Sequence, residues 1–278
     1  MEEEVLKLTK TFSLKTAKQY ENLIEALKKT CRKYAKEKTL DLLDKVKMTH
    51  RQSHKPSSLS GGEQQRIALI RALAPQPKIM LMDEPFSGLD DRLRDEVRDE
   101  TFNLLRSEDT AVVMVTHDPQ EAMKVADEIA LMRDGKILQR GAPYNIYNAP
   151  VDLKALQFFS DANAIQATLN GSLADTPFGQ FFAPGLSDGT DIDIVFRPQH
   201  VRIDFDRKGR GPLPTASQGV AAKGIVKRAR FVGNESLIEF EMDFGISIKA
   251  SVPNVFLPNT GHPLWLTVPR DKCYIFPK

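Results

Sequence analysis

The sequence predicts an α/β fold with a mainly parallel sheet, followed by a small all-β domain. Two apolar segments, residues 78–83 and 111–116, lack polar–apolar alternation, as do strands of a parallel sheet that is buried on both faces. A helical pattern follows each segment, and this order of strands and helices is typical of a parallel α/β sheet. Beyond about residue 161, short alternating strands are separated by Gly and Pro, as in a β-barrel-like domain.

Residues 1–57 contain no glycine and are rich in Lys and Glu. Their apolar residues recur at helical spacing, first at Tyr20, Leu23, Ile24 and Leu27 and then at Leu40, Leu43 and Val46. This pattern predicts two or more helices whose charged faces are solvated. Pro56 then begins a turn, and a helix is expected over about 60–74, where Pro75 ends it.

The start of that helix is a candidate anion site. Ser60 is suited to cap the helix, and Gly61 and Gly62 leave backbone N–H groups open at its positive end. Such an end binds anions, most naturally a phosphate.

Acidic and imidazole side chains follow the two predicted parallel strands. Asp83 and Glu84 end the first strand and His117 follows the second, at the sheet edge where open α/β sheets bind ligands. Asp83 is suited to Mg²⁺ and Glu84 to orienting an attacking water. Plainer interpretations stay open: acids after strands often form turns, a lone His is usually structural, and Asp90 is as well suited to capping the next helix.

The rest of the chain alternates helices and strands before the β-domain. Helices are expected over about 91–107 and 119–126, and two strands are expected to pair around Asp134-Gly135. Pro143 to Phe159 is expected to be helical and to link the domains. In the β-domain, Ile238, Phe240 and Met242 alternate with Glu239 and Glu241, which predicts one buried face.

Composition excludes several classes of protein. The 278 residues suggest one large or two ordinary domains. Because the net charge is only +2, we expect no nucleic-acid partner. Cys31 and Cys273 are far apart in the sequence, without metal-type spacing, which fits a reduced protein. No apolar run approaches the ~20 residues that span a bilayer, so work at a membrane would require docking on other chains.

These motifs together resemble the ATP-binding cassette (ABC) ATPases. The segments Leu59–Arg66, Met82–Pro85, Ser87–Asp90 and Thr116–Asp118 occur in that family's order and approximate spacing. The resemblance implies that Ser60, Gly61, Gly62 and Glu63 grip the γ-phosphate of ATP held by the opposite subunit. It implies that Asp83 serves Mg²⁺, Glu84 is the general base, His117 contacts the phosphate, and Asp90 lies in the D-loop at the dimer interface.

Further segments resemble bacterial importer subunits with a C-terminal TOBE domain, across about residues 31–278. They are His117–Ala122, Met132–Ile137, Gly141–Pro150, Phe196–Arg202 and Phe231–Gly233. Leu93–Glu100 and Thr176–Gly179 look most like the ferric-iron branch; molybdate, sulfate, polyamine and sugar branches are close competitors.

The resemblance also implies a domain plan, partners and a location. It divides the chain into a helical segment (1–58, family-like from about 31), an ATPase portion (59–160) and a TOBE-like domain (161–278). The implied partners are a second ATP-binding subunit, transmembrane permease subunits and a periplasmic solute-binding protein. The implied location is cytoplasmic, peripheral on the inner face of the cell membrane.

The family's P-loop, G-x-x-x-x-G-K-[ST], does not occur in the sequence, and no glutamine loop is identifiable. Since this loop cradles the phosphates, we expect no ATPase activity from this chain alone, and strands 79–83 and 111–116 to be left partly uncovered. A truncated gene or a misplaced start is one explanation. A non-catalytic interaction or regulatory subunit that pairs with a full-length ATPase is the alternative. A DNA-repair or cohesin-type ATPase is disfavoured by the TOBE-like segments and by the lack of a coiled-coil insertion.

Overall fold

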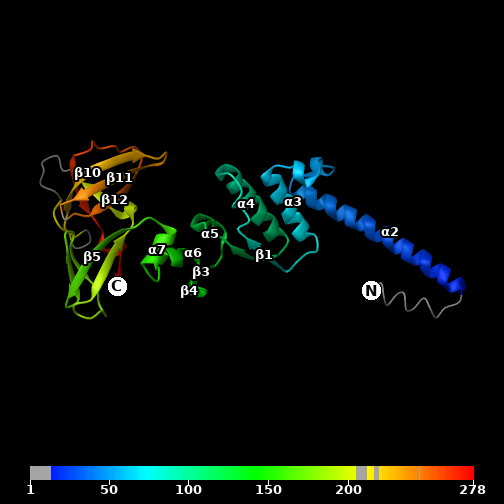
Figure 1. Ribbon diagram of the computed structural model, residues 1–278, viewed down its shortest axis with the longest axis horizontal. Helices are drawn as coiled ribbons and strands as arrows, with labels where there is room; N and C mark the ends of the chain where they lie inside the picture. The colour runs from blue at the N-terminus through cyan, green and yellow to red at the C-terminus, as the bar shows by residue number, and fades with distance from the viewer. Residues whose placement is uncertain (1–13, 205–211, 216–218, 244) are drawn as a thin grey trace. The chain divides into compact units, whose positions relative to one another are not determined.

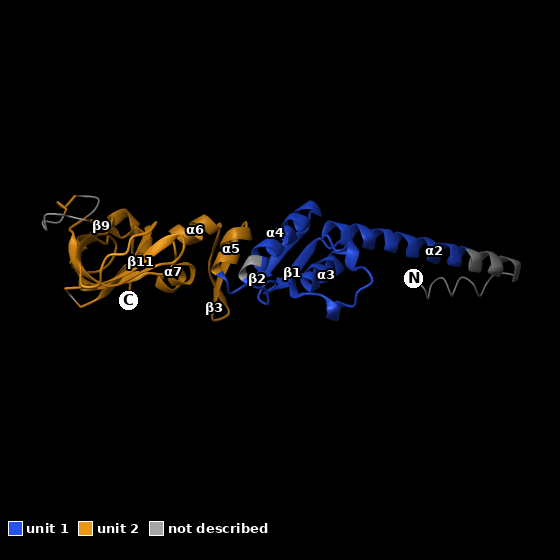
Figure 2. Ribbon diagram, turned by 90° about the horizontal axis from the view of Figure 1, so that it is seen from above, with its two compact units in different colours: residues 1–118 blue, residues 119–278 orange. Residues whose placement is uncertain are grey.

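The computed structural model describes residues 14–204, 212–215, 219–243 and 245–278 (Figure 1). The chain divides into two compact units, residues 1–118 and residues 119–278 (Figure 2). Each unit has its own hydrophobic core. The part of the expected N-terminal helical segment that covers residues 1–13 lies outside the described residues.

The first unit is built from three described helices and two described strands, with two short 3-10 turns between the first two helices. They are α2 (Leu14–Lys45), η1 (Thr49–Arg51), η2 (Pro56–Ser58), α3 (Gly61–Leu73), β1 (Ile79–Asp83), α4 (Asp91–Ser107) and β2 (Ala111–Val115). The helix boundaries of α3 and α4 agree with those expected from the sequence. The Lys/Glu-rich region between residues 14 and 45 forms one long helix.

Strands β1 and β2 pair in parallel, from Ile79 opposite Ala111 to Asp83 opposite Val115. One face of this pair packs on the core through Met80, which is 6% exposed. The opposite face is open to solvent in the described residues: Leu81 is 77% exposed, and Ile79, Val113 and Val115 are also exposed. The prediction that these strands are buried on both faces is therefore wrong, and the expectation that they are left partly uncovered is confirmed.

The core of the first unit brings the end of α2 against α3, α4 and β1. Leu42, Leu43 and Val46 of α2 belong to one cluster with Ile70 of α3 and Met80. A second, smaller cluster contains Phe86, Leu89 and Val97. This second cluster fixes the turn after β1 against the start of α4, so it positions the residues between the two elements.

The second unit begins with short helices and a hairpin and continues into the β-domain. Its elements before the β-domain are α5 (Pro119–Val125), β3 (Ile129–Arg133), β4 (Lys136–Gly141), α6 (Pro143–Asn148) and α7 (Leu153–Phe159). The β-domain contains β5 (Asn163–Asn170), β6 (Leu173–Thr176), β7 (Gly179–Phe182), β8 (Asp191–Phe196), η3 (Pro198–His200), β9 (Arg202–Asp204), β10 (Ala222–Phe231), β11 (Glu235–Met242), β12 (Ser247–Pro253), β13 (Pro263–Thr267), η4 (Arg270–Lys272) and β14 (Cys273–Pro277).

The hairpin at Asp134-Gly135 is confirmed. β3 and β4 are antiparallel, and the two turn residues have φ angles of 50° and 73°. Two positive φ angles in a two-residue loop match the right-handed twist of the strands. The dipeptide therefore directs the chain reversal locally.

The β-domain consists of two antiparallel sheets that enclose one core. Their strand orders are β12-β11-β10-β13-β9 and β14-β8-β5-β6-β7. Ile238, Phe240 and Met242 of β11 are all buried in this core, which confirms the expected alternation.

A buried arginine ties the linking helices to the β-domain. The side chain of Arg197 is 1% exposed and donates hydrogen bonds to Ser160 Oγ, to Tyr274 Oη and to the carbonyl oxygen of Tyr147. Its guanidinium also lies 3.7 Å from the centre of the Tyr147 ring. Burial of this charge is offset by hydrogen bonds and by the aromatic face together.

Candidate functional site

Glu84 and His117 meet at the carboxyl end of the parallel strand pair. Nδ1 of His117 lies 2.8 Å from Oε1 of Glu84. A carboxylate only accepts hydrogen bonds, so Nδ1 is the donor, and the contact holds the imidazole ring in one orientation. Both side chains are solvent-exposed, so a ligand can reach them. The two residues therefore lie close together at one edge of the sheet, as the sequence predicted.

The backbone of Glu84 is strained. Its φ angle is +42°, in the left-handed region that non-glycine residues rarely adopt. The Glu84 N–H donates to the Val115 carbonyl oxygen at 2.9 Å, which extends the pairing of β1 with β2 by one residue. The chain thus turns abruptly after Asp83 and directs the Glu84 carboxylate toward His117, two residues beyond the end of β2.

The start of α3 is closed by a reciprocal pair of hydrogen bonds. Ser60 is the N-cap: its Oγ accepts from Glu63 N, and Glu63 Oε2 accepts from Ser60 N at 2.8 Å. The predicted capping role of Ser60 is confirmed. The hydrogen bond from the Ser60 backbone lowers the pKa of the Glu63 carboxyl, and Arg51, which donates to Glu63 at 3.0 Å, lowers it further.

Of the two glycines after Ser60, Gly61 faces the turn that follows β1 and Gly62 faces the first turn of α4. A Cβ added at Gly62 would lie 3.0 Å from Leu93 Cδ2, and one added at Gly61 would lie 3.7 Å from Leu89 Cδ2. A side chain at Gly62 would therefore press on Leu93, since α3 and α4 approach closely there. Gly61 is exposed, which leaves its backbone accessible from solvent.

Asp90 is the N-cap of α4, because its Oδ1 accepts a hydrogen bond from Leu93 N at 3.1 Å. The plainer interpretation of this residue, as a helix cap, is thus confirmed locally. Capping also fixes where Leu89 and Leu93 lie, and these are the two side chains that contact the glycine pair. The turn 87–90 and the start of α3 therefore form one continuous surface in the first unit.

Two arginines that the sequence analysis did not single out support this surface. Arg94 donates to the Leu89 carbonyl oxygen at 2.9 Å and lies 3.8 Å from the Asp118 carboxylate. Arg51 pairs with Glu63, as described above. No local motif marks either residue, because each acts on a residue that folding brings near.

The residues present suit a phosphate more than a bare metal ion. Gly61 and Gly62 are the first two residues of the 13-residue helix α3, so their N–H groups have no acceptor within the helix and lie at its positive end. No cluster of three or more His, Cys, Asp or Glu side chains with metal-binding geometry occurs in the described part of the chain. Asp83 by itself would bind Mg²⁺ only together with phosphate oxygens and water.

Two family models match this chain, one in each half of the sequence. The ABC transporter family model matches residues 3–87, and the TOBE domain model matches residues 194–276. The first match begins well before residue 31, so the resemblance noted from the motifs covered too little of the N-terminal region. No helix in the described ranges is both long and apolar enough to cross a membrane.

Curated relatives are import proteins. The chain is 41% identical over 247 residues to the Fe(3+) ions import ATP-binding protein FbpC of Mesorhizobium japonicum, which covers 84% of this chain and 66% of the relative. It is 32% identical over 250 residues to the spermidine/putrescine import ATP-binding protein PotA of Pseudomonas fluorescens, covering 84% and 65%. The chain thus spans about two thirds of the length of these relatives.

Among solved structures, the chain is similar to MJ1267, an ATP-binding cassette of an ABC transporter, in its ADP conformation. The identity is 24% and the TM-score 0.41, and the match covers 45% of this chain and 50% of the other.

Proposed function

Because this chain belongs to the ATP-binding proteins of ABC transporters, we propose that it is an ATP-binding subunit of an importer and that its signature segment acts on ATP held by a partner subunit. The signature segment is Ser60, Gly61, Gly62 and Glu63. The observation that carries the proposal is the start of α3, where Ser60 and Gly61 are exposed at the positive end of the helix and Gly62 is buried behind them. Such an arrangement binds the terminal phosphate of a nucleotide.

In this proposal Glu84 and His117 form the hydrolytic pair. Glu84 accepts a proton from the attacking water, and His117 orients the Glu84 carboxylate through the 2.8 Å contact. With both ring nitrogens protonated, His117 also donates a hydrogen bond from Nε2 to the γ-phosphate. Asp83 would hold Mg²⁺, which neutralises phosphate charge when it is bound. Asp90 keeps the D-loop surface in place by capping α4.

We propose further that the 278-residue chain does not hydrolyse ATP by itself. Its sequence contains no G-x-x-x-x-G-K-[ST] segment, so a site made only of this chain would lack the phosphate cradle. A homodimer would pair two signature segments without a cradle. A heterodimer with a P-loop-bearing subunit would complete one site, because the partner supplies the cradle and this chain supplies Ser60–Glu63.

Ferric iron is the solute that we propose. The support is the 41% identity to a relative named as an Fe(3+) import protein; the relative named for spermidine and putrescine is less similar. The location proposed is the cytoplasmic face of the cell membrane, with permease subunits and a solute-binding protein as the further partners.

A mixing experiment tests the trans arrangement. A full-length family member with an intact P-loop but an inactivated signature is mixed with this chain, and phosphate release from ATP is measured. We expect release to appear with the natural chain and with Ser58→Arg, but not with Ser60→Arg. Ser58 is the matched control because it is exposed in the same loop. Equal activity of both variants would contradict the proposal.

Phosphate release by the purified chain without a partner tests the proposal that this chain alone does not hydrolyse ATP. Purified protein is expected to release no phosphate above background. Hydrolysis by the chain alone that disappears on Glu84→Gln would show that it is a self-sufficient ATPase. If no partner restores hydrolysis and equilibrium dialysis detects no nucleotide, the alternative of a non-catalytic interaction or regulatory subunit is favoured, because the missing P-loop is the observation that supports it.

A further inference from the structure

The first half of α2 carries an apolar stripe that the core does not use. Leu23 is 54% exposed, Leu27 is 55% exposed and Tyr34 is 64% exposed. Successive helical residues are rotated by about 100°, so these three side chains lie within a sector of about 40°. Thr30 and Cys31, which are also exposed, border the same sector.

This stripe is not a continuation of the core-facing side of the helix. Leu42, Leu43 and Val46 are buried and anchor the end of α2 in the first core. By the same geometry, their average direction is rotated by about 130° from the stripe. The helix therefore has two separate apolar sides, one packed inside the unit and one facing solvent.

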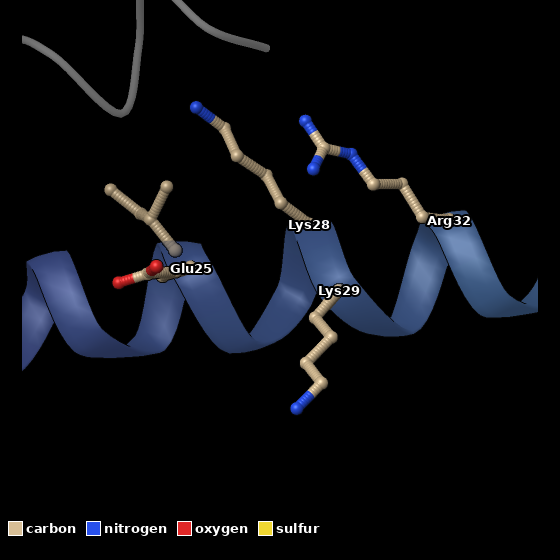
Figure 3. Close-up of a pocket in the computed structure, with 5 residues that line it drawn as sticks. Glu25, Lys28, Lys29 and Arg32 are labelled. Atoms are coloured by element: carbon tan, nitrogen blue, oxygen red, sulfur yellow. The ribbon is translucent and has the colours of Figure 1, made fainter.

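The side away from the stripe is predominantly basic. Between residues 23 and 38 the chain has six basic and two acidic residues, namely Lys28, Lys29, Arg32, Lys33, Lys36 and Lys38 against Glu25 and Glu37. At about 100° per residue, Lys28, Lys29, Arg32 and Lys36 lie about 120–160° from the centre of the stripe with Glu25 among them, whereas Lys33 lies on its flank and Glu37 and Lys38 border it. Lys28 and Arg32, one turn apart, point to the same side of the helix (Figure 3). No carboxylate of the described residues pairs with Lys28, Lys29 or Arg32, and the nearby Lys33–Glu37 contact is long, at 3.9 Å.

From this combination we propose that the residue 23–38 part of α2 binds the surface of an anionic phospholipid bilayer. A helix with an apolar stripe and a Lys/Arg-rich polar side lies in the membrane interface, with its apolar residues below the headgroups and its cations among them. A second copy of the chain is the less suitable occupant, because it would bring the same excess of positive charge against this one. The proposal does not depend on ATP or on the signature segment.

Vesicle flotation with the full 278-residue chain tests the proposal. We expect the chain to float with vesicles of equal parts phosphatidylcholine and phosphatidylglycerol and not with phosphatidylcholine alone. Each basic residue near an anionic surface strengthens binding by about fivefold, so K28Q/R32Q/K36Q should weaken binding about a hundredfold. The matched control K136Q/K154Q/K223Q removes the same charge from the second unit and should bind like the natural chain.

Variants of the apolar stripe test its contribution to vesicle binding. L23Q/L27Q should abolish flotation, whereas L213Q/V255Q, which alters exposed apolar residues of the second unit, should leave it unchanged. Absence of flotation with anionic vesicles overturns the proposal, as does equal loss in the control variants. Concentration-dependent dimers that L23Q/L27Q dissociates, without vesicle binding, would overturn it in favour of self-association.

Cys31 provides a site-specific reporter at the border of the stripe. It is exposed, whereas burial raises the pKa of the Cys273 thiol to about 12, so a thiol-reactive dye labels Cys31 selectively. A polarity-sensitive dye at Cys31 should shift to shorter wavelength with anionic vesicles. The same dye on K29C in a C31S background, on the basic side, should shift much less. Equal shifts at both positions would contradict the orientation of the helix.

Discussion

Nδ1 of His117 lies 2.8 Å from Oε1 of Glu84, although the two residues are separated by a whole helix in the sequence. The contact arises because β1 and β2 are parallel and in register, so residues just beyond Asp83 and Val115 lie side by side. The Glu84 N–H bond to Val115 holds the same junction. Strand register thus decides the geometry of this candidate catalytic pair.

The left-handed backbone of Glu84 predicts a stabilising substitution. Glycine adopts positive φ without strain, so Glu84→Gly should raise the free energy of unfolding by about 1 kcal/mol, measured in urea. Glu84→Val should lower it by a similar amount, because a β-branched residue fits this region poorly. Glu84→Gln keeps the strain and serves as the control. A loss of stability in Glu84→Gly would show that the side-chain contact with His117 outweighs the strain.

Close packing at Gly62 predicts an asymmetry between the two signature glycines. Gly61→Ala should be neutral or stabilising, because alanine favours helix and meets only ordinary contacts. Gly62→Ala should be less stable than Gly61→Ala by about 1–2 kcal/mol, because its methyl group presses on Leu93. A double-mutant cycle with Leu93→Ala measures this coupling. Additive effects of the two substitutions would exclude the contact as the cause.

The capping box predicts a pH-dependent contribution of Glu63 to stability. The folded-state pKa of this carboxyl is lowered, so its contribution is present above the unfolded-state pKa of about 4.3 and is lost as pH falls through the folded-state pKa. The stability difference between the natural chain and Glu63→Gln should therefore be constant at neutral pH and shrink in acid. Glu37→Gln, an exposed carboxyl on α2, is the control. A difference that grows in acid would contradict the assignment.

The buried contacts of Arg197 predict that replacing it lowers the free energy of unfolding of the second unit strongly. Arg197→Met removes three hydrogen-bond donors and leaves partly buried acceptors without them, so we expect a loss of about 2–4 kcal/mol in the free energy of unfolding. The single tryptophan of the chain, Trp265, lies in β13 and reports unfolding of this unit by fluorescence. Arg230→Met, at an exposed position of β10, should change stability little. Equal effects of the two substitutions would refute the anchoring role.

The exposed apolar face of β1 and β2 predicts that the chain self-associates, and that a polar substitution on this face reduces the association. Leu81→Thr should reduce light scattering and dye binding without lowering the urea midpoint, because Leu81 is exposed. Met80→Thr, one residue earlier, should lower the midpoint strongly, because Met80 is in the core. Unchanged scattering in Leu81→Thr would mean that this face does not drive association.

Local features of the fold were predictable from sequence because they depend on a few neighbouring residues. Ser60 with Glu63 caps α3, Asp134-Gly135 turns the hairpin, and the alternation at Ile238, Phe240 and Met242 buries one face of β11. Each of these follows from the backbone preferences or the side-chain period of one short segment. The resemblance to the ABC family was carried by such segments as well.

Only the tertiary structure decided which side of each element is covered and which distant side chains meet. An apolar strand has the same sequence pattern whether one or both of its faces are packed, so the exposure of Leu81 beside the buried Met80 could not be predicted from β1 alone. Likewise, Arg197 contacts Tyr147 and Tyr274 from separate parts of the chain. The sequence by itself determined the caps, turns and periodicities; strand register and packing determined the Glu84–His117 contact, because proximity across many residues arises only when the whole unit folds.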